Sequence, residues 1–381
     1  FCEHLAKVRD LCVEKGLSPE IWSDMFYRFS NEQHEYYSMT PEIKEEIRAI
    51  IPEGVKLWYW DYYHREQEMY EAMIKSHKEV NNGNVSLASG IWTWSKLWCD
   101  SAKNRETIYP AIRACHTMDV DELIFTMWGD DGGYCIYDSA LPNLAMTSDL
   151  AYGVSEAEVD NTAAVRTDAI CGLDYNAIMK AGETEIGVGY DDGKKAVYPR
   201  HPAILWDDPL QGIYYSSITG DGNKEAVPAI IERLTNTANT VKASANFEKD
   251  LSLQVVESLY TLLAMKLKFR AALIAAYDAN DKAALKQLAD ETIPALIAQH
   301  DKFSELYRTD WMSNCKPFGF EVIQIRNAGA RARYEETARL INELLAGKIA
   351  EISELKCRGC FTDTFNIGWN YRGVSAATVI Q

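Results

Sequence analysis

The sequence predicts an α/β fold, a parallel sheet followed by a helical domain, from three observations. Over residues 1–152, short apolar runs alternate with amphipathic helical segments, as in parallel strands joined by crossover helices. Four runs end on Trp22, Trp60, Trp92 and Trp128, at intervals of 38, 32 and 36 residues, which fits one strand, helix and return per unit. Beyond residue 224, apolar residues recur at three- and four-residue spacing, which indicates a helical bundle.

Four strand and helix units are predicted in the first part of the chain. An opening helix carries Leu5, Val8 and Leu11 on one face and stops at Gly16, a residue typical of helix C-termini. The predicted strands are 20–26, 55–63, 85–92 and 122–128. The predicted helices between them are 41–50, 66–80 and 104–118.

A parallel sheet of this kind is either doubly wound or closed as a barrel of the TIM type. Residues 129–133, Gly-Asp-Asp-Gly-Gly, have neither the GxGxxG spacing nor the following lysine of a nucleotide-binding loop. We therefore favour a (β/α)8 barrel, in which the loops at the carboxyl ends of the strands build the active site.

The remainder of the chain is predicted to divide into a connector and a helical domain. Residues 153–223 are rich in glycine, proline and aspartate and are expected to form short irregular elements. Long helical patterns follow at 255–276, 283–306 and 322–344, and a strand-like, aromatic tail begins at 361. The predicted domains are thus 1–152, 153–223 and 224–381.

Composition limits the partners and the compartment. Acidic residues outnumber basic ones by 56 to 39, a formal net charge of -17, so we expect neither nucleic acid nor a membrane surface as a partner. Nine scattered cysteines fit a reducing compartment and favour the cytoplasm. The CxxC at Cys357 and Cys360 lacks the second ligand pair of a zinc site. The chain starts at Phe1, inside a helical pattern, which we interpret as the middle of a gene product.

The strand-end tryptophans are accompanied by aspartates, and this pairing suits a sugar. Pyranose rings stack their C–H faces on indole, and their hydroxyls donate to carboxylates. The tryptophans that could wall such a site are Trp22, Trp60, Trp92, Trp94 and Trp128, and the aspartates that could bind hydroxyls are Asp24, Asp61 and Asp130. In the competing interpretation, the tryptophans are core residues and the aspartates are helix caps or turn residues.

Several segments resemble one family, the β-N-acetylhexosaminidases of glycoside hydrolase family 20, in the bacterial branch with a helical C-terminal domain. The matching segments are Ile21 to Phe26, Tyr59 to Tyr63, Ser89 to Trp94, Trp128 to Gly133, Leu205 to Leu210 and Lys316 to Val322. The resemblance implies that residues 1–152 form the second half of the barrel. It also implies binding of glycans ending in N-acetylhexosamine, with no cofactor and no metal.

The mechanism that the resemblance implies is substrate-assisted and retaining, an exception to the two-carboxylate rule. The acetamido oxygen attacks the anomeric carbon, a glutamate protonates the leaving oxygen, and the preceding aspartate orients the acetamido group. That Asp-Glu pair follows the fourth barrel strand, so we expect it upstream of Phe1 and expect this chain to be inactive alone. Either the missing half or a second copy of the chain would then cover the open edge of the sheet.

The resemblance also assigns binding roles. Trp128 would stack under the sugar ring, Asp130 would bind its outer hydroxyls, and Trp22 and Trp60 would wall the acetamido group. Where many relatives have Tyr-x-Asp, this chain has Trp92-Thr93-Trp94, so Tyr62 or another tyrosine would hold the acetamido oxygen.

Three other functions fit the same residues. The chain could be a sugar-binding module without hydrolysis, or a helical interaction module joined to a degenerate barrel. It could also be a two-carboxylate glycosidase that uses Asp61 and Asp130, for which the carboxyl groups must lie about 5 to 9.5 Å apart.

Overall fold

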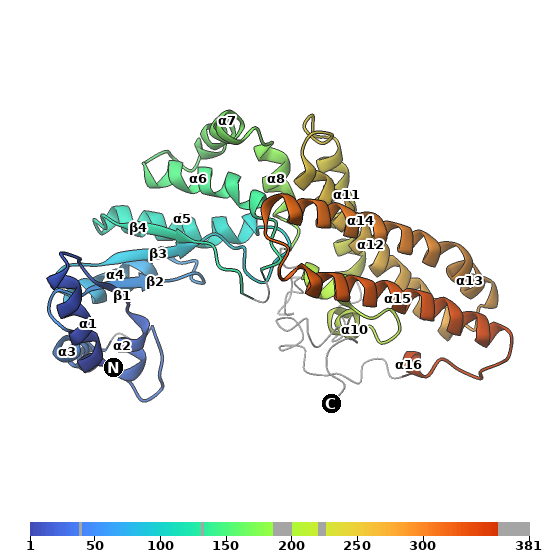
Figure 1. The fold of residues 1–381 in the computed structure, drawn as a ribbon, viewed down its shortest axis with the longest axis horizontal. Coiled ribbons are helices and arrows are strands. Elements are labelled where there is room, and N and C mark those ends of the chain that lie inside the picture. The colour runs from blue at the N-terminus through green and yellow to red at the C-terminus, as the bar shows by residue number, and fades with distance from the viewer. Residues whose placement is uncertain (38–39, 131–132, 186–199, 220–225, 357–381) are drawn as a thin grey trace. The chain divides into compact units, whose positions relative to one another are not determined.

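A computed structural model of the chain describes residues 1–37, 40–130, 133–185, 200–219 and 226–356 (Figure 1). The predicted tail and the Cys357 and Cys360 pair lie outside the described residues. The chain folds into two compact units. The first comprises Phe1–Trp92, Ala102–Trp128 and Asn143–Thr162, and the second comprises Thr93–Ser101, Gly129–Pro142 and Ala163–Gln381.

The first unit contains the predicted parallel sheet, which is confirmed with shorter strands. The strands are β1 (Glu20–Trp22), β2 (Lys56–Trp60), β3 (Ser86–Gly90) and β4 (Leu123–Thr126), paired in that order and all parallel. Residues 24–26, predicted as strand, instead begin a helix, in which Asp24 occupies the first turn, where a carboxylate is favoured by the helix dipole. Strand β2 ends at Trp60 because the Asp61 carboxylate accepts the N–H groups of Tyr63 and His64 and turns the chain.

Helices pack on one face of this sheet. They are α1 (Cys2–Glu14), α2 (Asp24–Phe29), α3 (Pro41–Ile50), α4 (Gln67–Val80) and α5 (Ser101–Thr117), and α6 (Leu141–Ala151) follows β4. The side chains of Leu57, Tyr59 and Leu87 alternate toward these helices and join a buried core with residues such as Ile47 and Ile74. The predicted amphipathic helices of this part of the chain therefore supply one side of the sheet.

The opposite face of the sheet is less apolar and less covered. Lys56 forms ion pairs with Glu20 and Glu122, and its ammonium lies 5.9 Å from the centroid of the Trp58 ring. Ile124 on the edge strand β4 is 37% exposed. Trp58, Ser86 and Ala88 on this face are nonetheless buried, so among the described residues the face is only partly open to solvent.

The second unit is helical, and this confirms the predicted bundle. After the 3-10 turn η1 (Tyr137–Ala140), its helices are α7 (Val159–Cys171, shared with the first unit), α8 (Tyr175–Ala181), α9 (His201–Trp206), α10 (Ile213–Thr219), α11 (Ala226–Lys242), α12 (Leu251–Asp278), α13 (Lys282–Gln287), α14 (Ile293–Asn314), α15 (Phe320–Leu345) and α16 (Ser353–Lys356). The long pattern at 283–306 is interrupted by a π-helical turn, η2 (Leu288–Thr292). Helices α7 to α10 occupy the region where short irregular elements were predicted, because turn residues there separate short helices.

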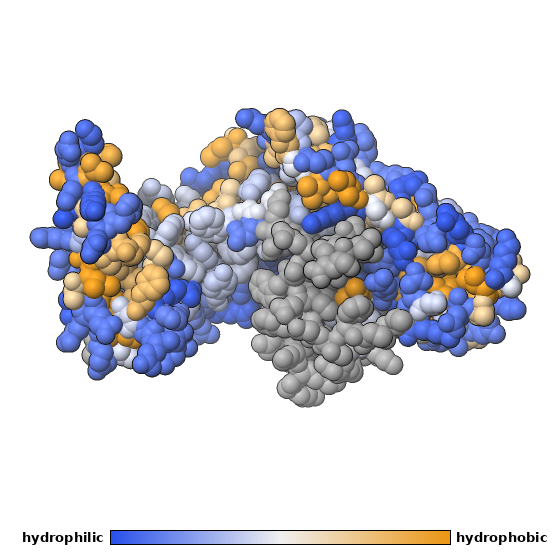
Figure 2. All heavy atoms as spheres, turned by 60° about the horizontal axis from the view of Figure 1, so that its bottom comes forward, coloured by the Kyte–Doolittle hydropathy of each residue, from blue (hydrophilic) through white to orange (hydrophobic). Residues whose placement is uncertain are grey.

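Helix α12 forms the centre of the bundle. It packs against α11 and α14, and α14 packs against α15, as Figure 1 shows for these long helices. Residues on all sides of α12 are buried, including Leu253, Leu259 and Phe269, which explains why it has no polar stripe. No helix among the described residues is long and apolar enough to span a membrane. Apolar patches interrupt a mainly hydrophilic surface in the view of Figure 2.

We predict that Gly182→Ala destabilises the second unit, because a Cβ there would lie 2.2 Å from Ser101 Oγ and 2.6 Å from the backbone oxygen of Cys99. The free energy of unfolding, measured by urea titration, should fall by about 1–3 kcal/mol. The control is Gly329→Ala in α15, where a Cβ meets nothing within 4 Å and should stabilise the helix by up to about 1 kcal/mol. Equal stability changes in the two variants would contradict this packing.

Candidate functional site

The carboxyl ends of the four strands bring the tryptophan repeat to one edge of the sheet. Trp22 and Trp60 are the last residues of β1 and β2, and Trp92 and Trp128 lie two residues beyond β3 and β4. Because neighbouring parallel strands end at the same edge, these four side chains share the position at which barrel enzymes build their sites. This placement follows the predicted one.

Trp128 is the most exposed of these tryptophans, and its orientation is set by Tyr62. Trp128 is 41% exposed, and the Tyr62 hydroxyl forms hydrogen bonds with the side chains of Trp128 and Thr126. The Tyr62 ring is buried and stacks on Trp60, with centroids 5.3 Å apart and planes inclined by 22°. Burial raises the pKa of Tyr62, so its hydroxyl stays protonated, and its oxygen accepts the indole N–H of Trp128, which can only donate. An oriented, accessible indole is what stacking on a sugar ring requires.

Trp22 and Trp92 have different surroundings. Trp22 is partly buried and lies 6.3 Å from Trp58 between ring centroids. Trp92 is 5% exposed, with the Lys103 ammonium 5.4 Å from its centroid and Tyr63 at its edge. Trp22 thus keeps accessible ring surface, whereas Trp92 packs mainly as a core residue.

The two candidate hydroxyl-binding aspartates of the first unit, Asp24 and Asp61, both contact other groups of the protein. Asp24 lies in the first turn of α2, with Oδ2 3.6 Å from Arg28 Nε. Asp61 is fully buried, and its carboxylate accepts hydrogen bonds from the Tyr59 hydroxyl at 2.7 Å and from the N–H groups of Tyr63 and His64. Asp61 therefore shapes the loop after β2 and positions its neighbours.

Trp94 and Asp130 belong to the second unit. Trp94 is 6% exposed, and Asp130 is exposed, with its backbone oxygen accepting the N–H of Ser95 at 3.1 Å. The exposed Asp130 carboxylate has the accessibility that a hydroxyl-binding residue needs. Asp131 and Gly132, in the same glycine-rich loop, lie outside the described residues.

His64 is a site residue that sequence reasoning missed. Its Nδ1 lies 2.7 Å from Asp61 Oδ2, its side chain is 26% exposed, and the Tyr37 ring packs against it at 4.5 Å. The hydrogen bond to Asp61 raises the pKa of His64, so a positive charge is favoured at this strand end. The signal in the sequence is the Asp61-x-x-His64 spacing, which is too common to identify a pair by itself.

A second histidine, His77 of α4, is hydrogen-bonded into a chain of side chains that connects the ends of β1 and β2. Its Nδ1 lies 2.7 Å from the Met73 oxygen, which can only accept, so Nδ1 carries the proton and Nε2 accepts from the Ser23 hydroxyl at 2.7 Å. Ser23 Oγ in turn accepts from Tyr36, whose hydroxyl accepts the N–H of Trp60. This buried chain links the residue after Trp22 to Trp60. Burial lowers the pKa of His77 to about 4.

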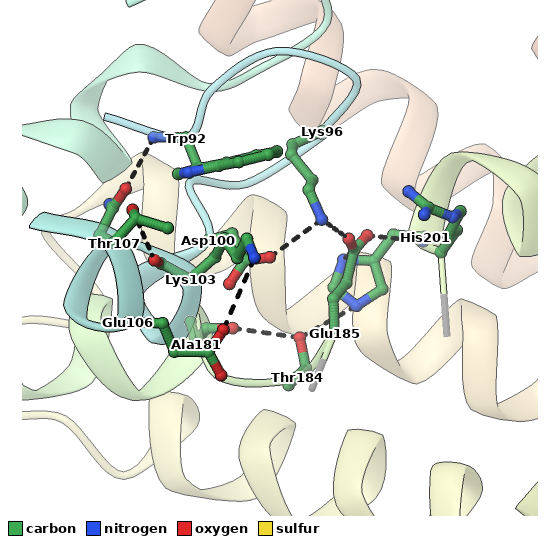
Figure 3. A network of polar contacts seen from close by, with 12 residues as sticks. Trp92, Lys96, Asp100, Lys103, Glu106, Thr107, Ala181, Thr184, Glu185 and His201 are labelled. Carbon is green, nitrogen blue, oxygen red and sulfur yellow. Dashed lines mark hydrogen bonds and ion pairs between the residues drawn. The ribbon is translucent and has the colours of Figure 1, made fainter. Parts of the chain in front are cut away.

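The second unit has a buried ionic network of its own, drawn in Figure 3. The Lys96 ammonium lies 3.0 Å from Asp100 Oδ2 and is paired with Glu185, which also accepts the backbone N–H of His201 at 2.8 Å. His201 Nε2 lies 2.9 Å from Thr184 Oγ1. Burial alone would lower the pKa of Lys96, but Asp100 and Glu185 outweigh it and raise the pKa. The network holds the loop before α5 against the segment that leads from α8.

Asp207 and Asp208, in the Leu205–Leu210 motif, also have structural partners. Asp207 accepts the N–H groups of Tyr214 and Tyr215 at the start of α10. Asp208 pairs with Arg333 of α15, with Oδ2 2.5 Å from Nε. These contacts join two loops of the bundle, which explains the aspartate pair without a catalytic role.

Two adjacent Asp-Glu pairs occur among the described residues, and neither follows a strand. Asp121 and Glu122 precede β4, where Glu122 is paired with Lys56 and accepts the Ser86 hydroxyl at 2.9 Å. Asp290 and Glu291 lie in the π-helical turn η2 of the second unit. Within the described ranges, no group of three His, Cys, Asp or Glu side chains is arranged to hold a metal ion.

We predict that the two histidines of the first unit titrate in opposite directions. In an NMR titration of the imidazole nitrogens, His64 should have a pKa above its usual 6.5 and His77 a pKa of about 4. Because burial favours the neutral form of His77, its contribution to the free energy of unfolding is complete above pH 6.5. That contribution is lost as the pH falls toward 4, and its full size is on the order of 3 kcal/mol. Asp61→Asn should return the His64 pKa toward 6.5 and leave His77 unchanged. Two ordinary titrations near 6.5 would refute both environments.

Comparison with known proteins locates one family domain in the chain. Residues 187–366 match the family model described as the Glycoside Hydrolase 20C C-terminal domain. No curated protein matches the chain. The matched residues include the described helices α9 to α16, which form most of the bundle. This part of the chain is thus similar to the C-terminal domain of glycoside hydrolase family 20 enzymes.

Proposed function

We propose that this chain is part of a β-N-acetylhexosaminidase, which removes terminal N-acetylglucosamine or N-acetylgalactosamine from β-linked glycans. The observation that carries the proposal is the accessible Trp128 indole, held by Tyr62 at the carboxyl edge of the sheet. The family match in the helical domain supports a glycoside hydrolase independently of that site.

In the proposed binding mode, one sugar ring stacks on Trp128, and Trp22 and Trp60 flank the acetamido group. Tyr62 has a second role in this mode, since it both stacks on Trp60 and orients Trp128. Asp61 acts through its neighbours, because its oxygens are buried against Tyr59, Tyr63 and His64.

We further propose that the reaction is substrate-assisted and that the catalytic Asp-Glu pair comes from outside this chain. In such a reaction the acetamido oxygen forms a bond to the anomeric carbon while the glycosidic bond breaks. The leaving oxygen takes a proton from a carboxylic acid at the strand ends. The two Asp-Glu pairs described above do not occupy that position.

The two edges of the sheet and the exposed Ile124 support the proposal that further βα units complete a barrel. Within the described residues, β1 and β4 each pair with one strand, and Ile124 keeps 37% exposure on the face away from the helices. Four further strands would satisfy both edges and cover that face. A second copy of this chain is the alternative that could do so.

The two-carboxylate alternative gains no support from Asp61. A nucleophile or general acid must reach the anomeric carbon or the leaving oxygen, and Asp61 is fully buried with both oxygens engaged. A sugar-binding module without hydrolysis remains compatible with the tryptophan site.

We predict that the purified chain binds a stable thiazoline analogue of the oxazoline intermediate and that Trp128→Ala weakens this binding by about tenfold. Isothermal titration calorimetry measures both affinities. Tyr152→Ala is the matched control, because Tyr152 is 91% exposed and lies away from the strand ends in the sequence. Equal affinities in the two variants would remove Trp128 from the sugar site. Binding of simple N-acetylglucosamine with no preference for the thiazoline would favour the binding module.

We predict that the chain alone does not hydrolyse an aryl N-acetyl-β-glucosaminide, because the proposed catalytic Asp-Glu pair comes from outside it. Release of the aryl alcohol is followed by absorbance. A longer protein that supplies four further βα units with an Asp-Glu pair at a strand end should turn over the same substrate. Turnover by the chain alone at 1 to 1000 per second, the ordinary range for enzymes, would overturn the proposed origin of the acid.

A further inference from the structure

The loop after β2, residues 61–64, presents a second exposed aromatic ring at the carboxyl edge of the sheet. Tyr63 is 48% exposed, against 41% for Trp128, and both residues belong to the first unit. Only β3 separates β2 from β4, so the ends of these two strands lie two strand spacings apart, about 10 Å. Two sugar rings in sequence can therefore reach both aromatic residues.

Tyr63 is fixed by its neighbours although its ring stays accessible. Its backbone N–H donates to Asp61 Oδ1 at 3.0 Å. Its ring meets the Trp92 ring edge-on, with centroids 5.8 Å apart, and meets the Tyr62 ring in the same way at 6.0 Å. Tyr62 is also hydrogen-bonded to Trp128. Tyr62 thus contacts both exposed rings and holds one in relation to the other.

His64 adds a hydrogen-bond donor beside Tyr63. Its Nδ1 lies 2.7 Å from Asp61 Oδ2 and donates to this carboxylate. Its Nε2 has no hydrogen-bond partner among the described residues, and the side chain is 26% exposed. The hydrogen bond to Asp61 raises the pKa of His64, which favours the imidazolium form with a proton on Nε2.

An accessible aromatic ring next to an N–H donor matches the chemistry of a pyranose. The C–H face of the sugar packs on the ring, and a hydroxyl or acetamido oxygen accepts the hydrogen bond. Because the Asp61 carboxylate balances the charge of the His64 imidazolium, the pair suits a neutral oxygen better than an anionic group. The loop after β2 therefore has the groups that a neutral sugar needs.

We propose that Tyr63 and His64 form a second sugar subsite. Tyr63 stacks on the ring that follows the one bound by Trp128, and His64 Nε2 donates to an oxygen of that second ring. The inference rests on the proposed function and deepens it, because the preferred ligand becomes a disaccharide unit in place of a single terminal sugar. The sugar on the far side of the cleaved bond is then selected by the loop after β2.

The test compares one sugar ring with two by isothermal titration calorimetry of the purified chain. The ligands are methyl N-acetyl-β-glucosaminide and thio-linked N-acetylglucosamine disaccharides in each of the β linkages that the sugar hydroxyls allow. The sulfur prevents hydrolysis, so binding alone is measured. We expect at least one disaccharide to bind about tenfold more tightly than the methyl glycoside, which is the gain from one additional stacked ring.

Substitutions in the loop separate the second subsite from the first. Tyr63→Ala and His64→Ala should each remove the disaccharide gain and leave the affinity for the methyl glycoside within about twofold. That unchanged affinity also shows that each variant is folded. Tyr63→Phe keeps the ring and should keep the gain. Tyr152→Ala, at a 91% exposed position distant in sequence from the loop, is the matched control and should bind as the parent does.

A pH series separates hydrogen bonding by His64 from packing. Neutral His64, with Nδ1 donating to Asp61, has an Nε2 that can only accept, whereas the imidazolium donates. The hydrogen bond to Asp61 and the Glu66 charge raise the pKa of His64, while the adjacent Tyr37 and Tyr70 stay protonated because burial raises the pKa of both. The disaccharide gain should therefore fall as the pH rises through the raised pKa of His64. The affinity for the methyl glycoside should not follow this titration.

The possible results distinguish the subsite from the proposed function. Binding of the methyl glycoside with no gain for any disaccharide would overturn the second subsite and leave the proposed function standing. A gain that persists in Tyr63→Ala and His64→Ala would do the same. Failure of every sugar to bind would overturn the proposed function, and the second subsite with it.

Discussion

The parallel alignment of β1 to β4 is the constraint on which the candidate sugar site depends. Parallel neighbours end at the same edge of a sheet, so residues 38 and 32 positions apart in the sequence, such as Trp22, Trp60 and Trp92, reach that edge together. An antiparallel sheet would send alternate tryptophans to opposite edges. The repeat in the sequence is therefore a repeat of position, because the crossover helices keep every strand in the same direction.

Buried polar groups then fix the geometry of that edge. Asp61 ends β2 by accepting two backbone N–H groups, and the Ser23, Tyr36 and His77 chain ties the end of β1 to the Trp60 backbone. Each bond is buried, so breaking one would leave an unpaired group in a low-dielectric environment. Polar contacts with buried residues also orient the exposed tryptophan, because Trp128 is hydrogen-bonded to the buried Tyr62.

The sequence was sufficient for the existence and order of the four strands and for the helical bundle, because apolar periodicity reports which side chains are buried. It was insufficient wherever a tertiary contact decided the outcome. Strand 20–26 stopped at Trp22 because residue 24 starts a helix, and Asp61 was assigned to sugar hydroxyls although its partners are Tyr59 and His64. Neither the burial of a carboxylate nor the identity of its donors can be read from spacing. The pairing of His64 with Asp61 is of this kind.

Carboxylates with protein donors anchor loops in both units. Asp61 in the first unit and Asp207, Asp208 and Glu185 in the second have their oxygens directed at N–H, hydroxyl, ammonium or guanidinium donors of the protein. Such satisfied groups stabilise loops and have little capacity left for a ligand. Asp250 is used in the same way, since its Oδ1 caps α12 by accepting the N–H groups of Ser252 and Leu253. The buried carboxylates of this chain therefore act mainly by fixing where one element ends and the next begins, and the accessible strand-end tryptophan Trp128 is left as the group best placed to meet a ligand.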